Sequence, residues 1–134
     1  MRCFIVDDSQ SYIDIIKTVI SDFCSSIGST TEAANAIEKI IEFDPDVIVV
    51  DWLMPDKSGL DLATEIAEND RINHIPVIMV SGASMVLKTF KHLKIDEFIS
   101  KTDSISNIRS TLKIFSNIGR INKAARQIDV NSKK

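Results

Sequence analysis

Five polar residues end or follow short apolar runs of this sequence, and together their types could do chemistry. They are three carboxylates, one hydroxyl and one ammonium group: Asp7, Asp8, Asp51, Ser81 and Lys101. Carboxylates that point at one spot raise each other's pKa, so a cation must hold them, and a set of oxygen ligands suits Mg²⁺. A metal ion beside a lysine and a hydroxyl can stabilise a phosphoryl group. If the five side chains meet, the pattern therefore indicates a site that handles phosphoryl groups.

Each of these residues also has an ordinary structural explanation. An aspartate after a strand is usually a turn residue, and Asp8 or Ser9 could simply cap a helix that begins near residue 10. A single serine or lysine in a loop carries little information. Whether they form a site depends on the elements that bring them together.

Short β-rich runs alternate with longer helical patterns along the chain. The predicted strands are 2–6, 26–30, 46–51, 75–81 and 95–100, and the predicted helices are 9–24, 32–43, 58–68, 84–93 and 104–118. This alternation indicates right-handed crossovers and a parallel sheet, and the unbroken apolar central strands indicate helices on both faces. The predicted fold is a three-layer α/β/α sandwich. Ligands bind outside the carboxyl ends of such strands, where all five polar residues would converge.

The composition fits one globular domain with a core of its own. The chain has 134 residues, of which 44% are hydrophobic and 26% charged. No run reaches the ~18 apolar residues of a membrane helix, and the four apolar residues before Asp7 are too few for a signal peptide. We therefore expect a cytoplasmic protein with no membrane partner. Cys3 and Cys24 should be reduced thiols, and Cys3 should pack in the core.

The net charge of −3 is unevenly distributed. Residues 1–118 hold 11 basic and 18 acidic residues, which gives 11 − 18 = −7, and residues 119–134 hold five basic and one acidic residue, which gives 5 − 1 = +4. The acidic body argues against direct nucleic-acid binding. The basic tail could contact an acidic partner, although a solvated, frayed chain end is the favoured explanation for so short a segment.

Four stretches together resemble the receiver domain of bacterial two-component response regulators. They are VDDS at 6–9, DWLMPDKSG at 51–59, VSGA at 80–83 and FISK at 98–101. The resemblance covers residues 2–118 and implies a flavodoxin-like fold, with a five-stranded parallel sheet in the order 2-1-3-4-5. We expect a receiver domain over 1–118, followed by a basic, partly helical extension or linker over 119–134.

The resemblance also implies a role for each polar residue. Asp51 is the expected phosphoacceptor, since it ends the central strand and Pro55 stiffens the following turn. Lys101 would neutralise charge on the transferring oxygens, and the Ser81 hydroxyl would bond the attached phosphoryl group. Phe98 matches the switch aromatic of the family, with ordinary core packing as the alternative. The expected Mg²⁺ ligands are Asp7, Asp8, Asp51 and the backbone carbonyl of Leu53.

The function implied is phosphorelay signal transduction by a phosphoprotein. A sensor histidine kinase or phosphotransfer protein would donate a phosphoryl group to Asp51, and the surface formed by residues 82–108 would then switch. A downstream effector protein or domain would read this surface, and a homodimer formed on phosphorylation is left open. No turnover of an independent substrate is expected.

Two other classes of function compete with this interpretation. The chain could be a receiver-like interaction domain that phosphorylation does not control. It could also be an enzyme, either a flavodoxin-like cofactor binder or an aspartate-nucleophile phosphatase. The acidic first loop, Asp7-Asp8-Ser9, would repel a cofactor phosphate, and no carboxylate stands two residues after Asp51.

The sequence departs from the family in three places. The family usually has a cis proline after the lysine, whereas this chain has Thr102, so we expect either a trans bond with a rearranged loop or a strained cis bond. The segment between Ser81 and Lys101 is about two residues shorter than usual, which predicts a short or displaced helix. Leu53 and Ala83 cannot position water, so we expect slow hydrolysis of an aspartyl phosphate.

Helical spacing continues beyond Gly119, through Ile121, Ala125 and Ile128. Gly119 could cap the last helix, or that helix could run on towards an effector or a dimer partner. The second alternative is favoured.

Overall fold

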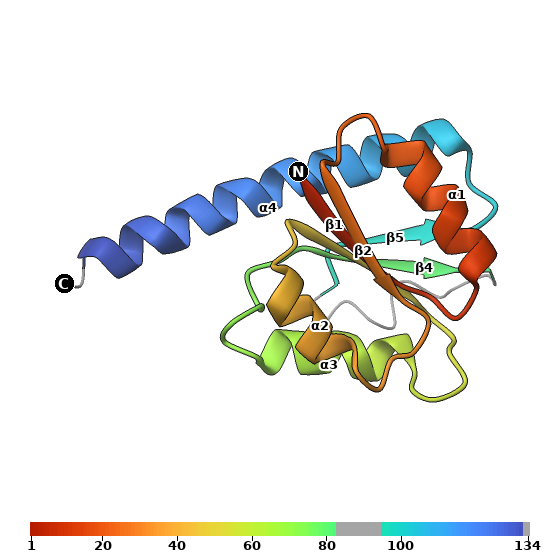
Figure 1. The fold of residues 1–134 in the computed structure, drawn as a ribbon, viewed down its shortest axis with the longest axis horizontal. Helices are drawn as coiled ribbons and strands as arrows, with labels where there is room; N and C mark the ends of the chain where they lie inside the picture. The colour runs from red at the N-terminus through yellow and green to blue at the C-terminus, as the bar shows by residue number, and fades with distance from the viewer. Residues whose placement is uncertain (83–94, 133–134) are drawn as a thin grey trace.

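The computed structural model describes residues 1–82 and 95–132, with side chains up to residue 129 (Figure 1). Its elements are β1 (Arg2–Val6), α1 (Gln10–Ile20), β2 (Ser26–Thr30), α2 (Ala36–Phe43), β3 (Val47–Asp51), α3 (Gly59–Glu68), β4 (Val77–Ser81), β5 (Glu97–Ser100) and α4 (Ile105–Ser132). The five strands are all parallel and lie in the order β2-β1-β3-β4-β5, which confirms the predicted sheet. The helix predicted at 84–93 lies outside the described residues.

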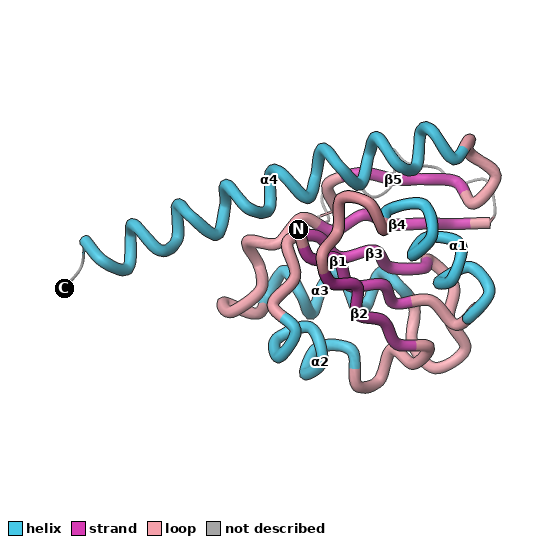
Figure 2. Tube along the Cα trace, turned by 45° about the horizontal axis from the view of Figure 1, so that its top comes forward, coloured by secondary structure: helices cyan, strands magenta, loops and turns pink. Residues whose placement is uncertain are grey.

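The sheet is covered by helices on both faces (Figures 1 and 2). Alternate residues of β1 serve two separate cores, because successive side chains of a strand point to opposite faces. Phe4 and Val6 pack with α2 and α3, and Cys3 and Ile5 pack with α1 and α4. The three-layer sandwich is therefore confirmed. No helix in these described ranges has the length and hydropathy to span a bilayer.

Several helices begin or end at other residues than the apolar periodicity of the sequence predicts. Ser9 caps α1, because its Oγ accepts a hydrogen bond from the Tyr12 amide at 3.2 Å, so the capping role offered for Asp8 or Ser9 belongs to Ser9. The apolar pattern predicts this helix up to residue 24, but it ends at Ile20 in a tight turn in which the Cys24 amide donates to the Ile20 carbonyl. The helix predicted from 32 begins only at Ala36. Side-chain periodicity does not locate such turns.

The last helix, α4, continues without a break through Gly119 to Ser132. Gly119 therefore does not cap the helix, and the favoured alternative, a helix that continues beyond Gly119, is confirmed. Twenty-eight residues at 1.5 Å each make α4 about 42 Å long. A Cβ atom at Gly119 would collide with the backbone oxygen of Asp46, so this glycine lets the helix pass close to the main chain before β3. Figure 1 shows the end of α4 projecting beyond the sheet.

Candidate functional site

The carboxyl ends of the central strands place the polar residues at one edge of the sheet. Asp7 directly follows β1, Asp51 ends β3, Ser81 ends β4 and Lys101 directly follows β5. Backbone hydrogen bonds fix this alignment. The Trp52 amide donates to the Val80 carbonyl, and the Lys101 amide donates to the Ser81 carbonyl, each at 2.8 Å.

Three carboxylates form the acidic cluster that the sequence predicts. One oxygen each from Asp7, Asp8 and Asp51 lies within 4.8 Å of the other two. Asp7 and Asp51 are buried, whereas Asp8 is exposed. A donor set made only of carboxylate oxygens, partly open to solvent, fits a hard divalent cation such as Mg²⁺. The residues present therefore suit the expected ion.

Lys101 reaches into this cluster from the end of β5, which is separated from β3 by β4. Its Nζ lies 2.9 Å from Asp7 Oδ2 and 3.7 Å from Asp51 Oδ2. The same atom lies 4.6 Å from the centre of the Tyr12 ring. One ammonium group is thus held between two carboxylates and an aromatic face.

The surroundings of Asp51 disfavour its charged form. Burial and the neighbouring charge of Asp7 raise the pKa of Asp51, Lys101 lowers it, and a hydrogen bond with the Asp8 side chain raises it again, giving a pKa of about 6. A cation bound among the carboxylates would offset the repulsion that contributes to this shift. The cluster is therefore an electrostatically strained site that positive charge would relieve.

The turn after Asp51 depends on a second glycine. The Gly59 amide donates to the Trp52 carbonyl at 2.9 Å, and a Cβ atom at Gly59 would collide with the backbone oxygen of Asp51. Met54 is buried inside the turn, while the Leu53 side chain is 63% exposed. This explains why the motif needs glycine eight residues after Asp51. The structure gives no geometry for the Leu53 carbonyl, so its role as a Mg²⁺ ligand stays a prediction.

The loop after Lys101 is held without the proline of the family. The described residues contain no cis peptide bond, so the Lys101–Thr102 bond is trans. This is the first of the two predicted alternatives, a trans bond rather than a strained cis bond. The Thr102 amide donates to Ser100 Oγ at 3.2 Å, and the Ser100 amide donates to Asp103 Oδ2 at 3.1 Å. These side chains close the turn, and Lys101 still reaches the carboxylates.

The two predicted switch residues lie on adjacent strands. Ser81 is 2% exposed and thus sits at the buried side of the site. Phe98 is partly buried and packs on the core between the sheet and α2 and α3, as Trp52 also does. This contact supports the alternative of core packing for Phe98, and a switching role stays a prediction. Ala83 and much of the 82–108 surface lie outside the described residues.

Tyr12 also borders the site, and it is not among the residues predicted for the site from the sequence. Burial, followed by the charges of Asp7, Asp103 and Asp51, raises the pKa of Tyr12 to about 12. Its buried hydroxyl has no hydrogen-bond partner within the part of the chain that the structure describes. The sequence signal that could have indicated Tyr12 is its position three residues after the capping Ser9. The first turn of α1 borders the edge of the sheet where the site lies.

Comparisons with known proteins agree on one family. The profile of the response regulator receiver domain matches residues 3–113. Chemotaxis protein CheY1 of Helicobacter pylori is 31% identical over 96 residues, which are 68% of this chain and 77% of that protein. Protein-glutamate methylesterase/protein-glutamine glutaminase 1 of Methanospirillum hungatei is 31% identical over 117 residues, 81% of this chain but 33% of that protein. A CheY-like receiver domain protein from Methanospirillum hungatei, solved by crystallography, has a TM-score of 0.78 at 19% identity, covering 89% of this chain and 95% of that one.

Proposed function

Because the chain belongs to the response regulator receiver domain family, we propose that it is a phosphoacceptor of a two-component system, modified on Asp51. The observation that carries this proposal is the meeting of three carboxylates with Lys101 at one sheet edge. We assign the receiver unit to residues 1–118 and treat residues 119–134 as its extension. The donor is the phosphohistidine of a sensor histidine kinase or of a phosphotransfer protein.

In the proposed reaction, an oxygen of Asp51 forms a bond to phosphorus as the phosphorus–nitrogen bond of the donor breaks. No separate base is needed, because a carboxylate is already a nucleophile once ionised. Lys101 favours this ionised form and faces the oxygens that gain charge during transfer. The Ser81 hydroxyl, at the end of the neighbouring strand, would bond the attached group.

The residues that would hold Mg²⁺ are Asp8, Asp51 and the Leu53 carbonyl, with Asp7 as a contributor. Both oxygens of Asp7 already accept protein donors, the Ser9 amide at 2.8 Å and Lys101 at 2.9 Å, which favours an indirect contribution through water. When bound, the ion supplies positive charge that offsets repulsion between the carboxylates and the incoming phosphoryl group.

The proposed output is a change in surface, and the protein turns over no independent substrate. An aspartyl phosphate adds charge and acceptors beside Ser81 and Lys101, so β4, β5 and the loops after them are the first elements to respond. The 82–108 surface would present this change to a downstream effector. The family relatives include a much longer methylesterase, but the effector of this chain is not specified by its receiver.

Phosphorylation of the purified protein by acetyl phosphate with Mg²⁺ tests the proposal. Intact-mass measurement should show addition of one phosphoryl group to the wild type and none to Asp51→Asn, which keeps the shape of the side chain. Lys101→Ala should slow the reaction on the order of 10²-fold. The matched control is Lys57→Ala, since Lys57 pairs with Glu65 at 2.6 Å and should react normally. An unchanged wild-type mass would instead favour the interaction domain without phosphorylation.

A further inference from the structure

An exposed apolar stripe runs along α4 and has no role in the proposed phosphoryl chemistry. We define the α4 stripe as Ile114, Ile118, Ile121, Ala125 and Ile128. Their spacings of four, three, four and three residues are those of a coiled-coil seam. The four isoleucines are 57%, 38%, 67% and 69% exposed in chain order. We propose that the α4 stripe packs antiparallel against the α4 stripe of a second copy of this chain.

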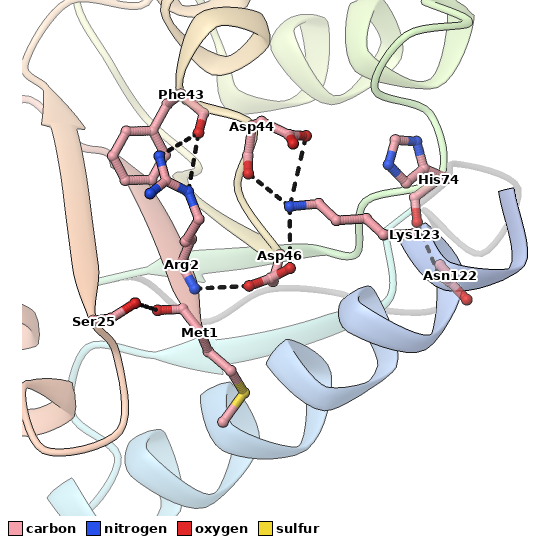
Figure 3. A network of polar contacts seen from close by, with 9 residues as sticks. All are labelled: Met1, Arg2, Ser25, Phe43, Asp44, Asp46, His74, Asn122 and Lys123. Atoms are coloured by element: carbon pink, nitrogen blue, oxygen red, sulfur yellow. Dashed lines mark hydrogen bonds and ion pairs between the residues drawn. The ribbon is translucent and has the colours of Figure 1, made fainter. Parts of the chain in front are cut away.

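The opposite face of α4 is clamped to the body, so the helix cannot roll to bury the stripe within one copy. Asn122 Nδ2 donates to the His74 carbonyl at 2.9 Å, and Lys123 Nζ donates to the Asp44 carbonyl at 2.6 Å (Figure 3). Lys123 Nζ also pairs with Asp46 Oδ1 at 3.1 Å, and Arg126 donates to the Asp70 carbonyl at 2.9 Å. Together with the close approach at Gly119, these contacts fix the rotation of α4 and leave the stripe facing outwards.

The charged residues of this part of α4 are kept away from the stripe. On a helix of 3.6 residues per turn, Arg120, Lys123 and Arg126 lie outside the seam positions. The positions directly beside the seam are occupied by Asn117, Ala124 and other residues with little charge, Asp129 excepted. Interface cores are depleted in charge in this way. A second α4 is a fitting partner, because a two-fold axis pairs one such stripe with its own copy.

The charge distribution decides the direction of packing. Residues 119–134 carry +4 and residues 1–118 carry −7. In a parallel pair the two basic tails would lie side by side and repel, whereas in an antiparallel pair each tail runs along the acidic body of the other copy. The helix dipoles also favour the antiparallel direction.

Side-chain size points to the same direction. In the antiparallel register centred between Ile118 and Ile121, Ile114 faces Ala125 of the second copy, so a large side chain meets a small one where the stripe narrows. Ile128 then faces Thr111, just beyond the stripe. A parallel, in-register pair would set Ala125 against Ala125 and leave a gap in the seam. In a parallel coiled coil, isoleucine at both kinds of seam position also favours trimers or tetramers over a dimer. This pairing does not depend on phosphorylation or on Mg²⁺.

Sedimentation equilibrium of the unphosphorylated full chain without Mg²⁺ tests the pairing. The wild type should be a dimer, and Ile121→Asp should shift it to monomer with at least a tenfold weaker association. The matched control is Ile105→Asp, which changes an isoleucine of α4 with 63% exposure that lies off the stripe, and it should leave the dimer intact. A monomeric wild type, or a dimer weakened by Ile105→Asp and not by Ile121→Asp, would overturn the proposal. Circular dichroism checks that each variant is folded.

Disulfide formation tests the direction. A protein with Ile114→Cys mixed with one carrying Ala125→Cys should form a mixed disulfide, because these positions face each other across the two copies. Ala125→Cys alone should not link to itself, since the two positions would be eleven residues apart along the axis, about 16 Å, beyond disulfide reach. Cys3 and Cys24 are buried free thiols and stay out of the reaction in the native state. Efficient self-linking of Ala125→Cys would overturn the antiparallel pairing.

Discussion

At the scale of single residues, the three carboxylates of the site are balanced mainly by the positive charge of Lys101. Lys101 is held by Asp7, by Asp51 and by the face of Tyr12. Each contact restricts the position of the ammonium group, so in the proposed transfer the lysine would be in place before the phosphoryl group arrives. Preorganised charge of this kind is more effective than charge that must move into place. Tyr12 is therefore a positioning residue for Lys101.

Substitutions of Tyr12 separate its ring from its hydroxyl. Tyr12→Phe keeps the ring beside Lys101 and removes a buried hydroxyl that has no partner in the described ranges, so stability should be unchanged or rise by up to about 1 kcal/mol. Tyr12→Leu loses the cation–π contact and should cost roughly 0.5–2 kcal/mol. Urea denaturation measures both, and slower phosphorylation by acetyl phosphate in the leucine variant alone would show the positioning role. Equal losses for both variants would contradict it.

The raised pKa of Asp51 makes stability depend on pH. Its pKa rises from 3.8 to about 6, so the folded protein holds this proton more tightly than the unfolded chain. That contribution is fully present below pH 4 and is lost as the pH rises through 6. Asp51→Asn lacks the penalty of the buried charge, so in EDTA its stability relative to the wild type should increase from pH 4 to pH 7.5. Because one pKa unit is worth about 1.4 kcal/mol, the gain is at most about 3 kcal/mol.

Asp61→Asn is the control for this pH series, since Asp61 lies in the exposed first turn of α3. Its stability relative to the wild type should not rise over the same pH interval. A flat difference for Asp51→Asn across the series would mean that Asp51 titrates normally in the folded protein.

At the scale of elements, two glycines let the main chain approach itself where packing is tightest. Gly59 brings α3 against the end of β3 and so shapes the turn beside Asp51, and Gly119 brings α4 against the chain at Asp46. Both residues lie in helices, where glycine is otherwise unfavourable. Their presence is explained by the absence of a side chain, because both collisions are with backbone atoms, which cannot move aside as a side chain can.

Gly119→Ala should destabilise the protein even though alanine is the better helix former. Alanine favours an isolated helix by about 1 kcal/mol, but its Cβ would collide with the Asp46 carbonyl and push α4 from the body, for a net loss of roughly 1–3 kcal/mol. Thermal denaturation measures the change. Asn117→Ala, an exposed substitution on the same helix, should be neutral or slightly stabilising. If Gly119→Ala stabilises the protein as much as the control does, α4 does not pack closely at this point.

At the scale of the whole molecule, the fold gathers negative charge at one edge of an already acidic body. Residues 1–118 carry −7, and three of the carboxylates lie within 4.8 Å of one another. Such a molecule gains stability from any ion that binds the cluster in the folded state only. The affinity for divalent ions and the stability of the fold are therefore linked.

Mg²⁺ should raise the thermal midpoint of the wild type by several degrees. At a concentration one hundred times the Kd, binding to the folded state alone adds about 2.7 kcal/mol. EDTA should remove the gain, and Asp8→Asn should reduce it. Trp52, the only tryptophan and the neighbour of Asp51, should report binding by a change in fluorescence. NaCl at equal ionic strength is the control, and an equal shift with NaCl would mean that general screening, rather than a site, is responsible.

The sequence pattern alone determined a parallel sheet, its two covered faces and the set of residues at its edge, whereas the strand order followed from the family resemblance. Apolar runs of four to six residues leave few folds that bury them, and the carboxyl ends of parallel strands must meet at one edge. Asp7, Asp51, Ser81 and Lys101 could therefore be located without coordinates. The helix ends at Ile20 and Ala36 could not, because turns and caps depend on local hydrogen bonds rather than on periodicity.

The tertiary structure decided what depends on contacts between distant segments. Gly119 could equally end a helix or allow close packing, and only the approach of Asp46 from another element distinguishes the two. Tyr12 was not predicted as a site residue, because only the folded chain brings Lys101, 89 positions later, beside its ring. The outward direction of the α4 stripe likewise follows from contacts of α4 with Asp44, Asp46 and Asp70. Spacing gives the face of a helix, but what that face meets is set by residues far away in the chain.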